Sequence, residues 1–441
     1  MRVMKFGGTS VAGADRLRHV ASLVGEAASA ERVVVVVSAL AGVTDALAAA
    51  FELAVEGKRY QDTWASLRER HRVELETLHG QSEEAAALDA ILTQVEPCLA
   101  AVQAGAPAPP ARDEVLAAGE RLSLVLAGAA LREAGLPVVL WDTRRLVRTD
   151  SHFGEARVRS GATAAALRAA WHATPTNAVV VATGFIGADR YGRTTTLGRG
   201  GSDYTASLMG ASLAADRIEI WTDVDGVLSA PPALAVGGVP IPYLDYQEAL
   251  EIARFGGKVL HPNTMTPAAR HRIPIRVRNT FAPLASGTLV GPGEPHPTPA
   301  AKAVSAVEEA VLLGWEGEVP PRPLLRAAGA FPCPGPGPLP TMWVVPASSL
   351  ARVMPLRPTQ VRHGVTLVAV VGRGLEPLPP AAAVRAAVRA VRLPVLATVA
   401  TGSPLSAAVV VPRGLRAEAV RVLHQRFVAA AAPTAATLYG R

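Results

Sequence analysis

Five consecutive valines, Val33–Val37, constrain the fold more than any other feature of the sequence. A strand with one face in water alternates apolar and polar side chains, whereas an unbroken apolar run of strand length suits a strand covered on both faces. Residues 2–6 also have the pattern of a short strand, and after a glycine turn residues 15–28 place Leu and Val at helical spacing. These strand, turn and helix units predict an α/β fold with a mainly parallel sheet.

The chain has 441 residues, enough for two or three domains. Residues 46–110 are rich in Leu, Ala and Glu and predict an insertion of two or three helices outside the sheet. A run with four prolines in nine residues predicts a linker over 291–303. Beyond it, residues 364–430 predict a small α+β module, and residues 304–363 predict a proline-broken version of the same module.

The composition argues against several classes of protein. Apolar residues make up 49% of the chain, but the longest apolar runs, such as Leu124–Leu131, are much shorter than a membrane span. Cys98 and Cys333 lie 235 positions apart without other ligands at metal-binding spacing, which disfavours a disulfide framework or a structural zinc site. We therefore expect a reducing, cytoplasmic setting, no membrane span, and no leader before the motif at Lys5.

The net charge of +7 is concentrated in the C-terminal third. Residues 301–441 hold 15 basic and 6 acidic residues, a balance of +9, so the rest of the chain has a balance of −2. The arginines of this third stand singly between Ala, Val and Pro, without the basic clusters and interleaved aromatic residues of a nucleic-acid surface. We expect no nucleic-acid partner.

Only four of the 44 basic residues are lysine, and two of them, Lys5 and Lys258, stand beside glycine pairs. A compact ammonium on a flexible stem can approach a phosphate where a guanidinium cannot. The segment Lys5–Ser10 leaves a predicted strand and opens a helix, so its backbone N–H groups and the helix dipole can face an anion. The same residues also fit a tight strand-to-helix turn with a solvated lysine.

Two further features suit substrate contacts. The segment Ser38–Thr44 follows the valine strand, at the end of the sheet where open α/β folds bind ligands, and its small side chains and hydroxyls suit a carboxylate. It also fits a plain turn in which Thr44 caps a helix. Glu120 lies among apolar residues of a helix predicted over 112–133, where an acid can bind a substrate amino group or simply face solvent.

The segment Thr196–Asp203 combines glycines, an arginine, a hydroxyl and an acid before a helix predicted over 204–214. Arg199 suits bidentate binding of a substrate carboxylate, and Asp203 suits the positioning of a cation or of the transferring group. Such a density of charge among glycines favours a binding loop.

The last cluster joins Asp223 and Asp225, after a strand predicted over 218–221, to the downstream motif Phe255–Pro262. The two acids also fit an Asx turn. Lys258 is placed to reach nucleotide phosphates. The histidines show no paired metal-binding spacing, so no zinc chemistry is expected and no residue is assigned as a metal ligand.

Together these motifs resemble those of the aspartate kinases of the amino acid kinase family, which phosphorylate the side-chain carboxylate of L-aspartate with MgATP. The resemblance holds in order and spacing over about residues 1–290. Its motifs are Lys-Phe-Gly-Gly-Thr-Ser-Val at 5–11, Ser-Ala-x-Ala-Gly-Val-Thr at 38–44, Gly-Glu at 119–120, Leu-Gly-Arg-Gly-Gly-Ser-Asp-Tyr-Thr-Ala at 197–206, Thr-Asp-Val-Asp-Gly-Val at 222–227 and Phe-Gly-Gly-Lys-Val-Leu-His-Pro at 255–262. It implies a three-layer α/β/α kinase domain over 1–290, followed by ferredoxin-like modules of the ACT type.

The resemblance also implies roles for individual residues, with ATP and Mg²⁺ as cofactors. Lys5 and Asp203 would form the catalytic pair, in which Lys5 stabilises charge on the transferring phosphoryl group and Asp203 organises the site. The residues expected to bind aspartate are Ser38, Thr44, Glu120, Arg199, Gly200, Gly201 and Ser202. The residues expected to bind the nucleotide are Lys5, Gly7, Gly8, Thr222, Asp223, Lys258 and Val259.

One segment departs from the family pattern. Leu228–Ala233 stands where the family has Tyr-Thr-x-Asp-Pro-Arg, so the aromatic, acidic and basic residues are absent. This departure predicts weaker ATP binding or a preference for another nucleotide. It also motivates one alternative, a non-catalytic amino-acid sensor on a kinase scaffold. A second alternative is a kinase for another amino-acid carboxylate, and the Arg199 and Glu120 motifs speak against it.

The C-terminal region resembles the paired ACT modules of these kinases, which bind end-product amino acids and form the dimer. The resemblance therefore implies a homodimer, a lysine or threonine effector, and a place at the first step toward lysine, threonine and methionine. Within the first module, the proline-rich stretch 331–340 is expected to be a loop.

Overall fold

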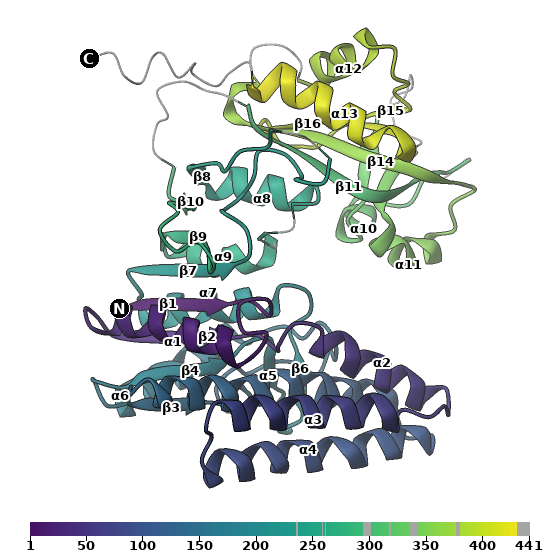
Figure 1. Cartoon of the computed structure of the whole chain (residues 1–441). Coiled ribbons are helices and arrows are strands. Elements are labelled where there is room, and N and C mark those ends of the chain that lie inside the picture. Colours follow the sequence, from purple (N-terminus) through teal and green to yellow (C-terminus); the bar gives the residue numbers. More distant parts are fainter. Residues whose placement is uncertain are drawn as a thin grey trace, which may run out of the picture. The chain divides into compact units, whose positions relative to one another are not determined.

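The computed structural model of the chain describes residues 1–234, 237–257, 259–260, 262–293, 301–316, 319–334, 342–375 and 380–429. It divides into two compact units (Figure 1). The first consists of Met1–Asp225 and Asn263–Pro292, and the second of Gly226–Pro262 and Gly293–Arg441. Residues 226–262, which we placed in a kinase domain over 1–290, therefore cluster with the second unit.

The first unit is built on a mainly parallel sheet, which confirms the predicted fold class. Its strands follow in the order β3-β4-β2-β1-β7-β9-β10, and every neighbouring pair is parallel except β9 and β10. The valine strand lies between β4 and β1 with every side chain at most 1% exposed. The strand bounds are β1 (Arg2–Phe6), β2 (Val33–Val37), β3 (Val138–Trp141), β4 (Val179–Thr183), β7 (Arg217–Thr222), β9 (Ile275–Asn279) and β10 (Thr288–Gly291).

Helices cover both faces of this sheet, so the unit has three layers (Figure 1). On one face, α1 and α5 share a continuous apolar core with Met4, Phe6 and alternate valines of β2. On the other face, α7 packs on β1 and β7, and α6 packs on α7. The helix bounds are α1 (Ala14–Ala28), α5 (Ala108–Glu133), the 3-10 helix η1 (Thr143–Arg145), α6 (Ser160–Ala173), α7 (Gly201–Leu213) and α9 (Pro262–Arg270).

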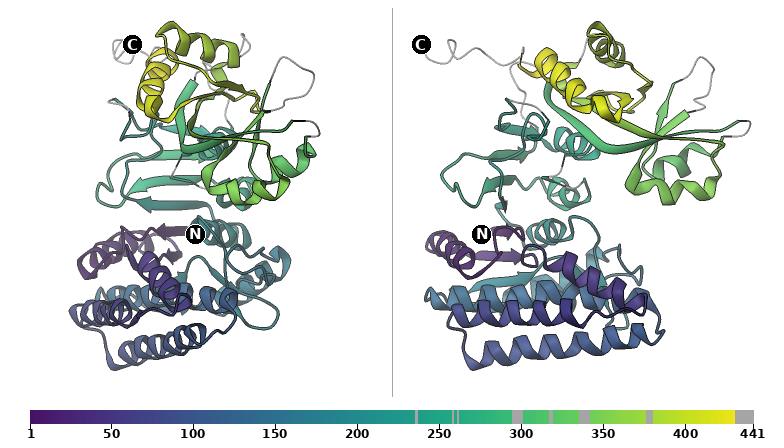
Figure 2. Two further views of the ribbon diagram at one scale, coloured as in Figure 1. Left: turned by 90° about the vertical axis from the view of Figure 1, so that its right-hand side faces the viewer. Right: turned by 45° about the vertical axis from the view of Figure 1, so that its right-hand side comes forward.

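Three more helices, α2 (Val43–Val55), α3 (Gln61–Thr77) and α4 (Ser82–Gln103), lie side by side with α5 (Figures 1 and 2). They occupy the region in which the sequence indicated a helical insertion. By length and composition alone, α4 could cross a membrane. In the structure its apolar side chains pack against α2 and α5, and Glu84 forms an ion pair with Arg132 of α5 at 2.7 Å. It is an amphipathic helix of this bundle.

The second unit contains an antiparallel sheet in the order β12-β13-β11-β14-β16-β15. Two separate apolar cores lie on it, one with α10 and α11 and the other with α12 and α13 (Figure 1). The element bounds are β8 (Tyr243–Asp245), α8 (Tyr246–Arg254), β11 (Ala301–Gly314), α10 (Arg322–Ala327), β12 (Phe331–Cys333), β13 (Met342–Pro346), α11 (Leu350–Val353), β14 (Gln360–Gly372), α12 (Pro380–Ala390), β15 (Ala397–Val399), β16 (Ser406–Pro412) and α13 (Arg416–Leu423). Short 3-10 turns and a π-helical turn, His424–Val428, complete it.

The long strand β11 crosses from one module to the other, so the predicted module boundaries are wrong. Ala301 and Val304 pack in the core with α12 and α13, whereas Val311 and Leu313 pack in the core with α10 and α11. A register shift against β14 at Val307 separates the two halves. Because one strand serves both cores, residues 304–307 belong with the second module, and residues 301–303 are strand rather than linker.

The start of the proline-rich stretch is a strand, not the loop we expected. Phe331–Cys333 forms β12, which stands at the end of the sheet order beside β13, and Pro332 O accepts the Ala400 N–H at 2.9 Å. An edge strand tolerates Pro332 because an N–H that faces away from the partner is not needed. Residues 335–340 lie outside the described part of the chain.

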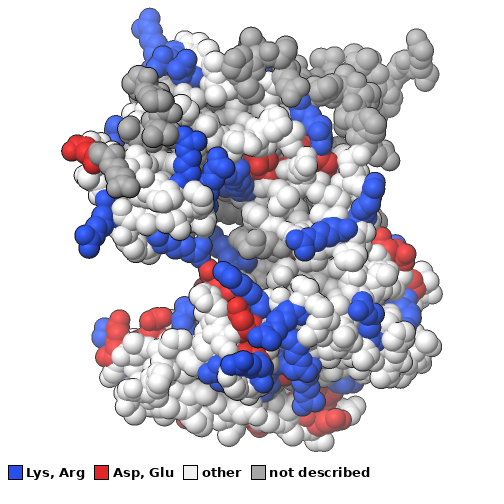
Figure 3. All heavy atoms as spheres, turned by 180° about the vertical axis from the view of Figure 1, so that it is seen from behind, with Lys and Arg blue, Asp and Glu red and all other residues white. Residues whose placement is uncertain are grey.

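Basic side chains on the face drawn in Figure 3 stand singly or in small groups, several beside acidic ones. In the second unit, Arg413 and Arg416 form ion pairs with Glu309 and Glu308 of β11, at 2.5 and 3.4 Å. Part of the positive charge of residues 301–441 is therefore compensated within this unit.

Candidate functional site

The motifs of the first unit gather at one edge of the sheet because β4, β2, β1 and β7 are parallel neighbours and end there together. Backbone hydrogen bonds join the segments that follow these strands. The N–H of Gly7 donates to Trp221 O at 3.1 Å, and the N–H of Gly184 donates to Val37 O at 2.8 Å. This edge is where open α/β sheets bind ligands.

Lys5 and Asp203 form an ion pair at this edge. The Lys5 Nζ atom lies 2.7 Å from Asp203 Oδ1, and the two side chains are 12% and 13% exposed. Asp203 stands in the first turn of α7, and Lys5 stands near the end of β1. The structure thus brings together the two residues predicted to form the catalytic pair.

The turn after β1 packs tightly against the turn after β2. A Cβ atom on Gly8 would lie 2.8 Å from Ala39 O, which is closer than real Cβ contacts allow. The Ala41 N–H donates to Gly8 O at 3.0 Å. The first two motifs are therefore one structure, with Gly7 beside the Lys5 ammonium.

Glu120 is a buried acid beside these turns. It is 3% exposed, and its Oε1 accepts the Ala39 N–H at 3.3 Å, while Oε2 has no hydrogen-bond partner among the described residues. Burial raises the pKa of Glu120 from 4.5 to about 8, opposed by the Ala39 N–H. An unpartnered buried carboxylate oxygen is a strong acceptor for a substrate ammonium group.

The Arg199 loop connects the hairpin of β5 (Ile186–Ala188) and β6 (Thr194–Thr196) to α7. Gly200 caps the helix with φ +73°, a conformation that glycine adopts without strain. Arg199 is exposed and makes no hydrogen bond or ion pair to another described residue. Gly201 and Ser202 are buried, Gly201 against Phe185 and Ser202 against Gly184. A free guanidinium on an anchored loop suits the binding of a carboxylate.

The other predicted site residues are less informative. Ser38 follows β2 directly and donates its N–H to Phe6 O at 3.2 Å. Thr44 does not cap α2, because Gly42 is the cap residue and Thr44 lies inside the first turn. The Thr222 hydroxyl donates to Asp223 at 3.2 Å, and Asp223 is exposed.

The downstream glycine motif belongs to the second unit. Phe255 stacks on Phe331 with ring centroids 5.1 Å apart, and a Cβ atom on Gly256 would lie 2.5 Å from Ala306 O. Val259 is half-buried, and Lys258 lies outside the described residues. The nucleotide contacts expected of Lys258 and Val259 stay predictions.

Comparison with known proteins identifies the family of this fold. Residues 1–279 match the model of the amino acid kinase family. The chain belongs to the amino acid kinase family. Within the family it is similar to lysine-sensitive aspartokinase 3 of Escherichia coli, with 39% identity over 290 residues, and to the chloroplastic aspartokinase 3 of Arabidopsis thaliana, with 38% over 295 residues.

Each of these alignments covers 65% of this chain, and the chain spans about 63% and 52% of the lengths of these two curated relatives. A solved structure is similar along almost the whole chain. It is E. coli aspartokinase III in complex with aspartate and ADP, with 29% identity, a TM-score of 0.83, and coverage of 96% of this chain and 99% of that one.

The segment that departs from the kinase family pattern is packed inside the second unit. Ala230 is buried in the core with α12 and α13, and the Ser229 carbonyl accepts the Val304 N–H at 2.8 Å. The Ser229 hydroxyl is hydrogen-bonded to the buried His424 at 2.9 Å. The small residues of 228–233 thus serve packing on the C-terminal modules.

One buried residue of the site was missed by the sequence reasoning. Asp113 of α5 is 1% exposed and accepts hydrogen bonds from Gly154 and Thr196, next to the Arg199 loop. The only sequence signal was an acid seven positions before Glu120, hence on the same helix face.

Proposed function

We propose that this chain is an aspartate kinase, which transfers the γ-phosphoryl group of ATP to the side-chain carboxylate of L-aspartate and forms 4-phospho-L-aspartate and ADP. The observation that carries the proposal is the buried Glu120, whose Oε2 lacks a partner among the described residues. Glu120 bonds the turn after β2 at Ala39, and this turn packs on the turn that follows Lys5. An amino-acid substrate supplies the missing ammonium group. The names of the similar proteins, aspartokinases, support aspartate as that substrate.

In such a transfer, we assign each of these side chains a separate role. The substrate's side-chain carboxylate has a pKa of about 3.9 and is ionised at neutral pH, so no general base is needed. Lys5 faces the charge that develops on the transferring phosphoryl group, and Asp203 holds the Lys5 ammonium in position. Glu120 binds the substrate ammonium, and Arg199 binds its α-carboxylate.

The residues present fit Mg²⁺ bound mainly through nucleotide phosphates. No cluster of three or more His, Cys, Asp or Glu side chains suited to a metal occurs in the described part of the chain. Mg²⁺ commonly uses one or two carboxylates together with substrate phosphates, and Asp203 and Asp223 are available at this edge of the sheet. When bound, the ion neutralises phosphate charge.

We propose a cytoplasmic homodimer at the first step toward lysine, threonine and methionine, with lysine or threonine as effector at the ACT-like modules. The name of the E. coli relative, lysine-sensitive aspartokinase 3, supports lysine. The two free thiols, Cys98 and Cys333, support a reducing compartment.

Hydroxylamine trapping tests the proposal, because it converts an acyl phosphate into a coloured hydroxamate. The full chain would be assayed with MgATP and L-aspartate, L-glutamate or N-acetylglutamate. Signal with aspartate alone is the expected result. Signal with another acid instead would establish a different carboxylate kinase. No signal from folded protein that still binds aspartate would refute the kinase and favour a non-catalytic sensor.

A further inference from the structure

Asp113 fastens two loops to helix α5. Its Oδ2 accepts the backbone N–H groups of Gly154 at 2.9 Å and Thr196 at 2.8 Å, and its Oδ1 accepts the Thr196 hydroxyl at 3.0 Å. These hydrogen bonds to a buried carboxylate are charge-assisted and stronger than neutral ones. They satisfy two donors of the buried Thr196, which would be costly to leave unpaired, and the N–H of the half-buried Gly154.

The two loops are also bound to each other where Asp113 meets them. The Ala156 N–H donates to Thr196 O at 2.9 Å. A Cβ atom on Gly198 would lie 3.2 Å from Glu155 Cγ, so the Arg199 loop rests directly on the 154–156 turn. Movement of Thr196 would therefore move the start of the Arg199 loop.

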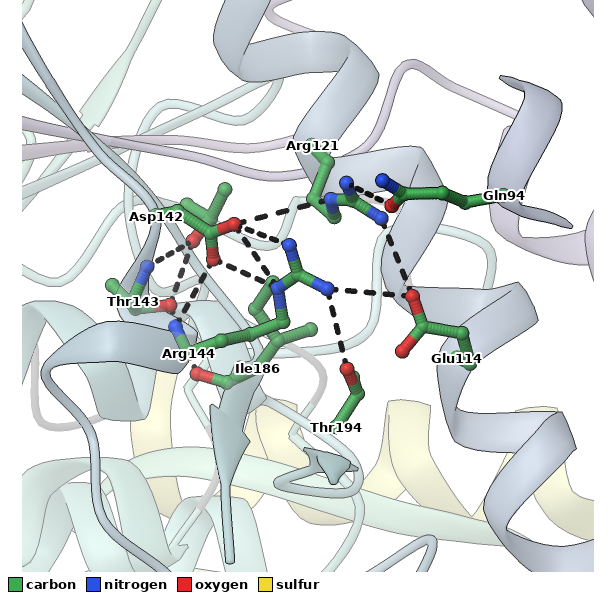
Figure 4. A network of polar contacts seen from close by, with 9 residues as sticks. Gln94, Glu114, Arg121, Asp142, Thr143, Arg144, Ile186 and Thr194 are labelled. Atoms are coloured by element: carbon green, nitrogen blue, oxygen red, sulfur yellow. Dashed lines mark hydrogen bonds and ion pairs between the residues drawn. The ribbon is translucent and has the colours of Figure 1, made fainter. Parts of the chain in front are cut away.

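A second set of contacts fixes the other end of β6 to the same helix. Arg144 donates to Thr194 Oγ1 and to Glu114 Oε1, both at 3.3 Å, and Arg121 donates to the same oxygen of Glu114 at 3.3 Å (Figure 4). Asp142 completes the network as the partner of Arg144. Strand β6 is thus attached to α5 at both ends, through Glu114 near Thr194 and through Asp113 at Thr196.

We propose that Asp113 is a positioning residue that holds the Arg199 loop at a fixed distance from Glu120. Asp113 and Glu120 lie seven residues apart on α5, about 10 Å along the helix axis. The far end of the loop is held by the ion pair of Asp203 with Lys5. Helix α5 thereby sets the spacing between the groups that bind the amino group and the carboxylate of the substrate. The assignment of these two groups rests on the proposed function.

Two substitutions separate the hydrogen bonds of Asp113 from its charge. In Asp113→Asn, the amide oxygen can accept both backbone N–H groups while the amide N–H₂ donates to the Thr196 hydroxyl, so the geometry can be kept. Burial raises the pKa of Asp113, and its hydrogen bonds from Gly154 and Thr196 oppose that rise. Asp113→Ala removes every acceptor. Glu84→Ala is the matched control, because it removes a buried acid from α4 that bonds Arg132 and the Gln81 N–H.

Hydrogen exchange of the full-length variants tests the positioning without turnover. In Asp113→Ala, the amides of residues 196–202 should exchange at least about tenfold faster than in the natural chain. In Asp113→Asn and Glu84→Ala they should stay protected. Unchanged exchange of this loop in folded Asp113→Ala would overturn the proposal. An equally large increase in the exchange rate in Glu84→Ala would also overturn it. If Asp113→Ala does not fold, Thr196→Val replaces it, which loses only the hydroxyl contact to Asp113 Oδ1. The amides of residues 196–202 should then exchange faster than in the natural chain, by less than in Asp113→Ala, and unchanged exchange would overturn the proposal.

Steady-state kinetics of the same variants measures the KM for each of the two substrates. Asp113→Ala should raise the KM for L-aspartate about tenfold or more, with the KM for ATP nearly unchanged, and Asp113→Asn should restore it. Parallel changes in both KM values, or no rescue by Asn, would contradict positioning. If the natural chain gives no hydroxamate at all, the proposed function fails, whereas the exchange experiment still decides whether Asp113 positions the loop.

Discussion

The Lys5 ammonium nitrogen lies 2.7 Å from Oδ1 of Asp203, although the two residues come from the first strand and from the start of α7. The parallel order of β2, β1 and β7 brings these segments to one edge of the sheet. A flexible lysine left alone at such an edge would sample many rotamers, and the carboxylate limits them. The pair therefore holds a positive charge in a fixed position beside the Gly7 turn, as the proposed phosphoryl transfer requires.

Lys5→Met should abolish hydroxamate formation, with a loss of at least about a thousandfold, because positioned charge supplies much of the barrier reduction in phosphoryl transfer. The fold should persist, since methionine fills a similar volume. Lys58→Met is the control, because Lys58 forms an exposed ion pair with Glu56 at the end of α2. Comparable activity in the two variants would remove Lys5 from the mechanism.

Asp203→Asn should lower kcat by about a hundredfold or more, because the neutral amide no longer holds the Lys5 ammonium. Asp15→Asn is the control. Asp15 also stands in the first turn of a helix but is 98% exposed. Circular dichroism would check folding of both variants. A kcat for Asp203→Asn close to that of the natural chain would mean that its ion pair with Lys5 has no part in turnover.

The sequence predicted the parts of the site that depend on local chemistry. The valine run indicated a strand buried on both faces, and the glycine turns after Phe6 and Val37 indicated loops at one edge of a parallel sheet. Lys5, Glu120 and Asp203 could be singled out because charges among glycines or apolar residues need a partner. The meeting of Lys5 and Asp203 in space followed from the parallel order of the strands.

Features that depend on distant packing could not be read from the sequence. Asp113 is an ordinary helical acid until Thr196 and Gly154, far along the chain, fold against it. Nothing local marks Phe331–Cys333 as an edge strand, because the tolerance for Pro332 comes from the strand's place in the sheet. Likewise, the hydrophobic pattern of the sequence does not indicate the register shift at which β11 passes from one core to the other.

Aspartate affinity should depend on pH through Glu120. Burial raises the pKa of Glu120 to about 8, so below that pH the carboxyl group of the free protein is protonated. Binding the substrate ammonium requires the carboxylate and therefore releases a proton. Affinity should rise up to about tenfold per pH unit as the pH increases toward 8. Calorimetry in buffers of different ionisation enthalpy would measure both Kd and the proton release.

The matched variant for this titration is Glu120→Gln, which keeps the shape of the side chain but cannot ionise. Its affinity for aspartate should be weaker and nearly independent of pH over the same range, with no proton released. If the natural chain shows the same flat profile, Glu120 is not the group that binds the substrate ammonium.

Gly8→Ala should destabilise the fold by about 1–3 kcal/mol, because the new Cβ atom would lie 2.8 Å from the backbone oxygen of Ala39. The turn after β2 has to shift to relieve this contact, and its Ala39 N–H is the one that Glu120 accepts. Activity should therefore fall beyond what the lost stability explains.

The control is Gly161→Ala in α6, where no atom lies within 4 Å of the added methyl group. That change should stabilise the helix by about 0.5–1 kcal/mol and leave activity unchanged. Urea unfolding of both variants measures the difference, and equal free energies of unfolding would show that the two glycine turns are not packed as tightly as the structure indicates.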